Sequence, residues 1–229
     1  MFLSSKLLAD NGFAHAFPTR NATDADVGAY FSAEVIVQVK QVHGGRVVEA
    51  AAAAGIEADA IVARASAQPA LSPARPSRAA PVAVGVRVAD CVPLLLADPR
   101  TGDVAAVHAG WRGVVAKIVP AAVGALAGGP LYAAIGPCIG ACCFEVGRDV
   151  GAQIAEACGT RQVVVWGAQD KVYVDLRAAV RAQLLALGVT NAHIDDVAGC
   201  TKHESARFHS FRRDGAGGGR MLAAIATRR

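Results

Sequence analysis

Several short apolar runs constrain the fold of this chain more than any other feature. Residues 82–88, 92–97 and 104–107 contain β-branched residues and few polar positions. A strand that is apolar on both faces is typical of a sheet covered by other layers on each side. Runs of the same kind recur at residues 34–39, 46–49, 60–62, 131–135, 163–166 and 221–226. These runs predict a sheet-rich core with both faces buried.

Fewer segments have the pattern of a helix. We predict helices at residues 114–126, 149–158 and 175–187, each of which ends shortly before or at a glycine. The third is the clearest, because Asp175 is a favourable N-cap and Gly188 a favourable stop. Strands interspersed with helices predict an α/β or α+β fold.

Composition excludes several classes of protein. With 229 residues, 53% of them hydrophobic and 18% charged, the chain is long and apolar enough to fold rather than remain disordered. No apolar run reaches the roughly 18–20 residues of a membrane span, and no secretory signal is visible, so we expect a cytoplasmic protein. The net charge of +4 is spread along the chain and only 5% of residues are aromatic, which argues against nucleic-acid binding. The oligomeric state is not fixed by the sequence, and we favour a monomer.

We expect one catalytic domain over residues 1–229. The segment at residues 65–81, rich in Ala, Ser, Arg and Pro, predicts a flexible surface loop between two strands. The glycine-rich stretch at residues 214–219 predicts a second flexible piece.

Three segments combine the end of an apolar run with a metal-binding or nucleophilic side chain beside a backbone-permissive residue. They contain His43, Cys91 and His108. Two histidines and one cysteine match the three-ligand sets of catalytic zinc sites, which keep one position open. The three residues are far apart in sequence, and taken one at a time such residues are more often a hydrogen-bonded structural histidine or a small buried cysteine than metal ligands.

A glycine-flanked loop at residues 136–147 holds Cys138, Cys142 and Cys143. Such clustering suggests binding of a soft metal, but a structural zinc site needs a second cysteine pair, and none follows at a suitable spacing. We therefore interpret the loop as the wall of a pocket rather than a set of ligands.

Arginines supply candidate anion sites. Arg212 lies beside a second arginine and shortly before a glycine-rich turn, a combination that suits a phosphate or carboxylate as well as a solvated basic loop. Arg112 follows a tryptophan at the predicted start of a helix, where the helix N-terminus would add to an anion site. Arg20 is a weaker candidate of the same kind.

Taken together, these segments resemble a known family. QVHG at residues 41–44, ADCVP at 89–93, HAGWRG at 108–113, IGPCIGACCFEVG at 135–147 and SFRR at 210–213 occur in this order. The combination resembles the laccase-domain family, also called the polyphenol oxidase or purine nucleoside phosphorylase family, to which a peptidoglycan editing factor belongs. Matches run from about residue 13 to 220. The chain departs from the family pattern at residues 21–27, in the long loop and near residue 218, which affects the expected pocket rim.

The resemblance implies a fold, a metal and an activity. The implied fold is a layered α/β/β/α sandwich with mixed sheets. The implied zinc ligands, which would also be catalytic, are His43, Cys91 and His108. The family's substrate residues fall on Arg20, Arg112, Cys138 and Arg212. The implied reactions are phosphorolysis of adenosine, inosine, guanosine and methylthioadenosine and deamination of adenosine, with a purine nucleoside and phosphate as substrates.

Other readings remain open. Deamination also needs a proton shuttle, for which Asp90 and Glu145 are candidates, although strand alternation would turn Asp90 away from Cys91. Alternatively, Cys91 could be the nucleophile of a metal-free cysteine hydrolase or editing factor acting on a peptidoglycan precursor, with His108 or His43 as its base. A non-enzymatic, metal-stabilised binding protein is a third class. A His₂Cys set also accepts copper, but a multicopper oxidase needs more imidazoles than six histidines plausibly supply.

Overall fold

The computed structural model describes residues 1–32, 35–66, 81–126, 129–165 and 170–228. Within this part of the chain, the largest sheet has six strands and is mixed, because both of its outermost pairs are parallel and the inner pairs antiparallel. From one edge to the other its strands are β12 (Ile194–Asp196), β8 (Tyr132–Ile135), β6 (Val92–Ala97), β7 (Val104–Ala109), β4 (Ala60–Ala63) and β3 (Val47–Glu49).

Two further sheets are antiparallel throughout. The four-stranded sheet contains, in spatial order, β1 (Phe2–Leu3), β2 (His15–Pro18), β13 (Met221–Ala226) and β5 (Ala83–Val88). The small three-stranded sheet contains β10 (Val164–Val165), β11 (Lys171–Val174) and β9 (Glu145–Gly147).

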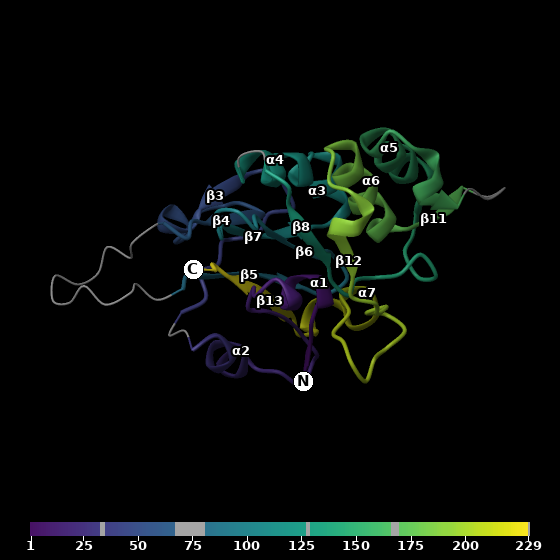
Figure 1. The fold of residues 1–229 in the computed structure, drawn as a ribbon. Coiled ribbons are helices and arrows are strands. Elements are labelled where there is room, and N and C mark those ends of the chain that lie inside the picture. The colour runs from purple at the N-terminus through teal and green to yellow at the C-terminus, as the bar shows by residue number, and fades with distance from the viewer. Residues whose placement is uncertain (33–34, 67–80, 127–128, 166–169, 229) are drawn as a thin grey trace, which may run out of the picture.

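Helices cover the outer faces of the two larger sheets. Figure 1 shows α3, α4, α5 and α6 over the six-stranded sheet and α2 under the four-stranded sheet, so the layers run helix, sheet, sheet, helix. This is the predicted α/β/β/α sandwich with a mixed sheet. The helices are α1 (Lys6–Asp10), α2 (Asp24–Phe31), α3 (Trp111–Val115), α4 (Ile118–Ala125), α5 (Arg148–Cys158), α6 (Leu176–Ala186) and α7 (Phe211–Asp214).

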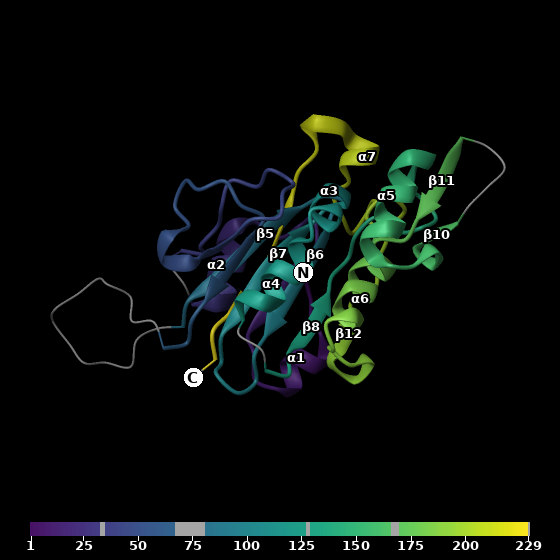
Figure 2. The same cartoon turned by 90° about the horizontal axis from the view of Figure 1, so that it is seen from above.

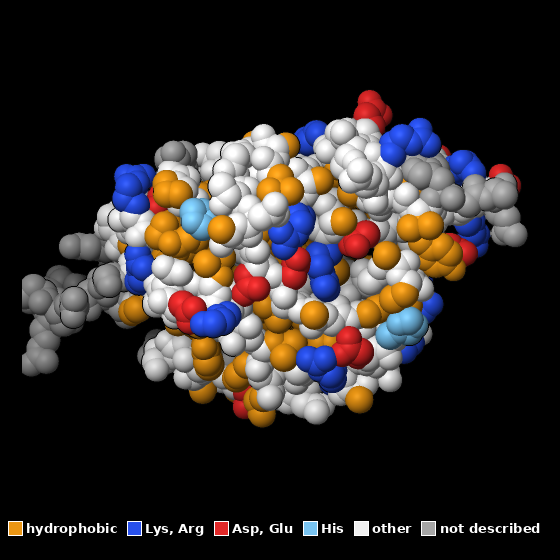
Figure 3. Space-filling view, turned by 45° about the vertical axis from the view of Figure 1, so that its right-hand side comes forward, with side chains coloured by type: hydrophobic (Ala, Val, Ile, Leu, Met, Phe, Trp, Pro, Cys, Tyr) orange, Lys and Arg blue, Asp and Glu red, His pale blue; other side chains and the backbone are white. Residues whose placement is uncertain are grey.

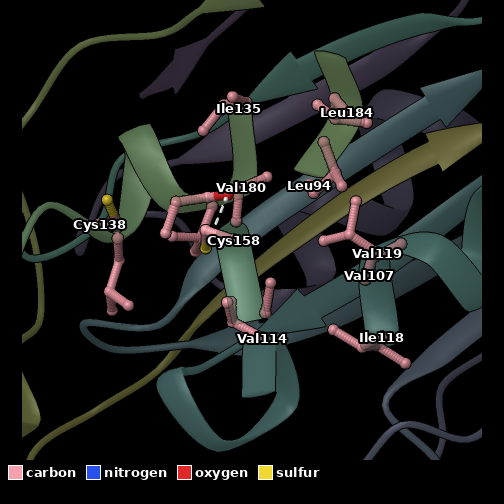
Figure 4. Close-up of a cluster of buried hydrophobic side chains, with 14 of the residues drawn as sticks. Leu94, Val107, Val114, Ile118, Val119, Ile135, Cys138, Cys158, Val180 and Leu184 are labelled. Atoms are coloured by element: carbon pink, nitrogen blue, oxygen red, sulfur yellow. Dashed lines mark hydrogen bonds between the residues drawn. The ribbon is translucent and has the colours of Figure 1, made fainter. Parts of the chain in front are cut away.

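The central strands bury both faces, as their unbroken apolar sequence predicts. In β6, Leu94 and Leu96 belong to the cluster that packs against the helices, whereas Leu95 points the other way, into the space between the two large sheets. Figure 4 shows the helix-side cluster, in which Leu94 and Val107 of adjacent strands meet side chains of the covering helices. Because successive side chains point to opposite faces, these strands pack against the helices on one side and against the four-stranded sheet on the other.

The predicted helix at residues 114–126 is wrong as a single element. The structure has two helices there, α3 and α4, separated at Lys117, whose φ of +63° is left-handed. Pro120 explains the break, because in a continuous helix its ring would collide with the carbonyl of Ala116 and it could donate no hydrogen bond. In the first turn of α4 neither penalty applies.

Two of the predicted helices are present in the structure, whereas one predicted strand is reduced to a single bridge. The predicted helices ending at Cys158 and beginning after Asp175 are confirmed as α5 and α6. A strand was expected at residues 34–39; residue 34 lies outside the described residues, and residues 35–39 make only a single bridge, between Val37 and Val84. The long loop predicted at residues 65–81 falls almost entirely outside the described residues, and the glycine-rich stretch after α7 includes a short 3₁₀ helix at Gly215–Gly217.

Surface charge and helix length bear on two of the predictions made from composition, the absence of a basic patch and the absence of a membrane span. On the face in Figure 3, lysine and arginine side chains alternate with aspartate and glutamate rather than gathering in one basic patch. None of the helices in the described residues is both long enough and apolar enough to cross a membrane.

Candidate metal centre

The three residues expected to bind a metal lie together although they are distant in sequence. One ligand atom each from His43, Cys91 and His108 lies within 4.8 Å of the others. The imidazole rings of His43 and His108 meet edge to face, with ring centroids 4.7 Å apart. His43 is exposed, Cys91 half-buried and His108 buried, so the cluster opens to solvent on the side of His43.

Strand pairing brings two of these residues together. β6 and β7 pair in an antiparallel register that sets Val92 opposite Ala109, and one step further along the same register Cys91 faces Gly110. A side-chain carbon at Gly110 would lie 2.8 Å from the Cys91 sulfur and 3.1 Å from a carbon of the His43 ring. Only glycine therefore leaves room for the cluster at this position.

Asp59, which sequence reasoning missed, orients both histidines. Its Oδ1 lies 2.8 Å from Nδ1 of His108 and accepts the backbone N–H of His43 at 2.9 Å. Its Oδ2 accepts the backbone N–H of Gly44 at 2.6 Å and that of Val42 at 3.3 Å. One fully buried carboxylate thus fixes the ring of one histidine and the backbone of the other.

This arrangement explains two local features. His43 has a φ of +62°, a left-handed conformation that is costly for a non-glycine residue, and the three backbone N–H groups around it are held by the Asp59 carboxylate. A carboxylate that accepts the Nδ1–H of His108 also leaves Nε2 of that ring as the ligand atom. Carboxylate–histidine pairs of this kind are the usual outer partners of metal-binding imidazoles.

The electrostatics of the cluster favour a thiolate. Burial alone would raise the pKa of the Cys91 thiol, but hydrogen bonds from His108 and His43 outweigh it and lower that pKa to about 7. Burial alone would lower the pKa of His108, but Asp59 and Cys91 outweigh it and raise that pKa to about 9. Hydrogen bonds from His108, Gly44 and His43 likewise outweigh burial and hold the pKa of Asp59 below its usual value.

The residues fit a divalent metal by their chemistry. The set offers two imidazoles and one thiol, an open side and an outer carboxylate, which are the features of a three-ligand catalytic zinc site. The same donors suit copper, so the donor set alone does not choose between the two metals.

Arg212 is tied to the segment that carries Cys91. Its backbone N–H donates to Oδ2 of Asp90 at 2.6 Å, and Oδ1 of Asp90 accepts the Thr201 hydroxyl at 2.6 Å. The Arg212 guanidinium donates to the Glu145 carbonyl at 2.9 Å and lies 5.4 Å from the centre of the Phe144 ring. In Figure 2, α7 with Arg212 lies at the same end of the central strands as α3.

The two candidate proton carriers are already engaged. Asp90 lies in a bend before β6, with a φ of +91°, and its carboxylate holds Thr201 and Arg212 in place. The carboxylate of Glu145 pairs with Lys171 at 3.2 Å. The carboxylate of Asp90 therefore positions Thr201 and Arg212.

The other predicted substrate residues have different surroundings. Arg112 stacks on Trp111 at 4.4 Å in α3, which is a single turn of five residues. The Arg20 guanidinium donates to the Ser205 carbonyl at 2.6 Å. Cys138 is fully buried, and burial raises the pKa of its thiol to about 12.

Cys138 also lines a cavity whose lining residues do not include His43, Cys91 or His108. Together with Arg177, Gly199, Cys200 and Glu204 it lines a cavity of about 290 Å³. Arg177 approaches the Cys138 sulfur at 3.8 Å and donates to the Gly199 carbonyl at 3.1 Å.

Residues 19–228 match the family model described as multi-copper polyphenol oxidoreductase laccase. The chain belongs to this family. The match covers all three residues of the candidate metal centre, Asp59, and the loops that carry Cys138 and Arg212. The resemblance inferred from the sequence motifs is therefore confirmed.

Curated relatives of this laccase-family chain carry names from purine metabolism. It is 41% identical over 152 residues to "Adenosine deaminase RL5" from an unknown prokaryotic organism, which covers 63% of this chain and 58% of the relative. It is 39% identical over 148 residues to "Purine nucleoside phosphorylase YlmD" of Geobacillus stearothermophilus, covering 61% of this chain and 54% of the relative. The chain thus spans somewhat more than half the length of these two relatives. With a purine nucleoside phosphorylase of Deinococcus radiodurans the identity is 38% over 200 residues, covering 85% of this chain and 71% of the relative.

Solved structures support the fold over the whole chain. The crystal structure of Neisseria meningitidis protein NMB0706 superimposes with a TM-score of 0.82 at 28% identity, covering 100% of this chain and 99% of that one. The crystal structure of YlmD from Geobacillus stearothermophilus gives a TM-score of 0.81 at 25% identity, covering 98% and 94%.

Proposed function

We propose that this laccase-family chain is a zinc-dependent purine nucleoside enzyme. Its reactions would be phosphorolysis of adenosine, inosine, guanosine and methylthioadenosine and deamination of adenosine. The observation that carries the proposal is the open cluster of His43, Cys91 and His108, with Asp59 behind it. The names of the relatives, adenosine deaminase and purine nucleoside phosphorylase, support the substrate class.

In this proposal His43, Cys91 and His108 hold the ion. A zinc ion in such a site supplies a Lewis acid that activates water and polarises a bound substrate near neutral pH. Asp59 keeps the proton of His108 on Nδ1 and fixes the backbone at His43, so the two imidazoles and the Cys91 sulfur keep their relative positions.

The arginines are proposed to bind the anionic and polar parts of the substrates. Arg212 is the strongest candidate, because its backbone N–H donates to the carboxylate of Asp90, the residue preceding Cys91, while its guanidinium lies against the Phe144 ring. Arg112, which lies four residues after His108 in the first turn of α3, and Arg20 would contribute to the same anion site. A guanidinium offers the planar donor geometry that matches phosphate oxygens. Cys138 would act as part of the pocket wall rather than as a reacting group, since its thiol is buried and its pKa raised.

One observation favours a second candidate, a cysteine hydrolase or peptidoglycan-editing enzyme. Asp59, His108 and Cys91 follow one another as acid, imidazole and thiol, the order found in cysteine nucleophile triads. Metal dependence separates the two functions, because a thiolate nucleophile needs no metal, whereas the purine nucleoside function requires one.

A multicopper oxidase reaction, which the family's name suggests, has less support. Among the described residues, the groups that can hold a metal include only three histidines, namely His43, His108 and His203. Oxidation of polyphenols by several coppers requires a larger set of imidazoles brought together.

The experiment is product analysis after the zinc-loaded protein is incubated with adenosine, with and without phosphate. Phosphorolysis gives adenine and ribose 1-phosphate only when phosphate is present, whereas deamination gives inosine, which phosphorolysis converts further to hypoxanthine in the sample with phosphate. Both products should disappear in the Cys91→Ala variant, which removes one proposed ligand, and persist in Cys158→Ala, which removes a thiol of α5 that does not belong to the cluster. Metal-replete protein that leaves adenosine unchanged would refute the proposal for this substrate.

A further inference from the structure

A second group of metal-binding side chains lies outside the His43 centre. Sγ of Cys142, Cys143 and Cys200 and a ring nitrogen of His203 lie within 4.8 Å of one another. Cys142 and Cys143 come from the loop between β8 and β9, and the other two from the loop that follows β12. These four residues, named here the Cys₃His cluster, share no member with the His43 centre.

The separations match a tetrahedral ion. The Cys142 sulfur lies 3.7 Å from the sulfur of Cys143 and 3.7 Å from that of Cys200. It lies 3.3 Å from Nδ1 of His203. In a tetrahedral zinc site with Zn–S bonds of about 2.3 Å and Zn–N bonds of about 2.0 Å, sulfurs are about 3.8 Å apart and sulfur and nitrogen about 3.5 Å. The sulfurs are much too far apart for a disulfide, which requires about 2.05 Å.

The second loop has the local structure of a metal knuckle. Cys200 and His203 are separated by two residues, a spacing typical of ligand pairs in structural zinc sites. The backbone N–H of Gly140 donates to the Cys200 sulfur at 3.3 Å, and the N–H groups of Lys202 and His203 donate to the same sulfur. Three N–H donors around one sulfur stabilise a thiolate, which is the form that binds a metal.

Other contacts hold the two loops against each other. A side-chain carbon at Gly140 would lie 3.1 Å from the Cys142 sulfur and 3.4 Å from that of Cys200, so a glycine permits their approach. Cys138 and Cys200 form a parallel bridge, and the Thr201 N–H donates to the Cys138 carbonyl at 3.0 Å. The four donors are therefore positioned by the backbone rather than by flexible side chains alone.

We propose that Cys142, Cys143, Cys200 and His203 form a structural site for a zinc ion, separate from the His43 centre. Four protein ligands complete a tetrahedron and leave no open position, as in structural rather than catalytic zinc sites. On binding, each cysteine thiol loses its proton to solvent and donates a sulfur lone pair to the ion.

The site would join the two loops that support the anion pocket. Thr201, next to Cys200, holds the carboxylate of Asp90, and Phe144, next to Cys143, lies against Arg212. A metal clamp at the Cys₃His cluster would therefore fix the wall of the pocket without touching the substrate.

The test uses the Cys91→Ala variant, which removes the first site and makes the result independent of the proposed function. Reduced, metal-free protein is titrated with Co²⁺, and metal content is measured after loading with Zn²⁺. We expect about one equivalent of tightly bound ion per chain, with the near-ultraviolet thiolate-to-cobalt absorption of a cysteine-rich tetrahedral site.

Two further substitutions and a control complete the test. Adding Cys142→Ser or His203→Ala should weaken binding by more than roughly 100-fold, since even outer partners of metal ligands contribute 10–100-fold. Both residues are exposed, so their replacement leaves the core intact. Adding Cys158→Ser, which also removes one thiol, should leave binding unchanged. Absence of bound cobalt in the reduced Cys91→Ala protein, or binding that survives Cys142→Ser and His203→Ala alike, would overturn the proposal.

Discussion

Replacing Asp59 by asparagine should separate metal binding from folding in the His43 centre. The carboxylate accepts four hydrogen bonds, two on each oxygen. In asparagine an NH₂ group replaces one of the two carboxylate oxygens. This group only donates hydrogen bonds and cannot accept from the two N–H groups that it faces, so two of the four bonds are lost. At about 1.5 kcal/mol for each bond to a charged group, the free energy of unfolding should fall by about 3 kcal/mol.

The same substitution should weaken the metal site. Loss of the outer partner of a ligating imidazole typically costs 10–100-fold in metal affinity, or about 1.4–2.8 kcal/mol. A loss of 3 kcal/mol in a chain of this size lowers the melting temperature by about 6–12 °C, which leaves the variant folded at room temperature. The affinity of Asp59→Asn for zinc can therefore be measured by competition with a chelator, and its stability by thermal unfolding.

Asp98→Asn is the matched control. Asp98 is also fully buried and accepts the backbone N–H groups of Arg100 and Thr101, but it lies at the far end of β6. This control should lower the melting temperature and leave zinc affinity unchanged. If Asp59→Asn bound zinc as tightly as the unmodified protein, the orienting role of Asp59 would be refuted.

Three further predictions concern the metal site, the N-terminal region and the anion pocket. Gly110→Ala should abolish metal binding at the His43 centre while the chain stays folded, because the added carbon would lie 2.8 Å from the Cys91 sulfur; Gly124→Ala, which meets nothing within 4 Å, should bind metal at that centre normally. Burial lowers the pKa of His15, so below about pH 6.5 the unfolded chain takes up a proton that the folded chain resists, and the free energy of unfolding should fall as the pH decreases. His15→Gln should remove this component, and identical slopes of stability against pH in denaturant unfolding would contradict it. Arg212→Ala should raise the KM for phosphate with unchanged zinc content, and an unaltered KM would exclude Arg212 from the anion site.

Local patterns in the sequence predicted a sheet covered on both faces and the bounds of α6, whereas the layered α/β/β/α arrangement was implied by the family resemblance. The apolar runs of β6 and β7 required burial on both faces, and Asp175 and Gly188 marked the ends of α6. The break between α3 and α4 could also have been predicted, since Pro120 stands in the middle of the expected helix and cannot occupy that position.

The contacts within the sites could not be predicted in the same way. Asp59 directly precedes the apolar run of β4, and a carboxylate at that position could have drawn attention, but its partners Gly44 and His108 are distant in sequence. The Cys₃His cluster was missed because a second cysteine pair was sought. The other two members are Cys200 and His203, which lie far along the chain, and one of them is a histidine. Only the three-dimensional pairing of the two loops makes these residues neighbours.

The central claim is that His43, Cys91 and His108 hold the metal on which the chain's activity depends. Anomalous diffraction at the zinc absorption edge, from crystals of the zinc-loaded protein, tests it most directly. We expect a strong anomalous peak bonded to the ring nitrogens of both histidines and the sulfur of the cysteine, separate from the peak proposed at the Cys₃His cluster, and we expect its absence in crystals of Cys91→Ala. Fully zinc-loaded crystals without a peak between these three side chains would contradict the account.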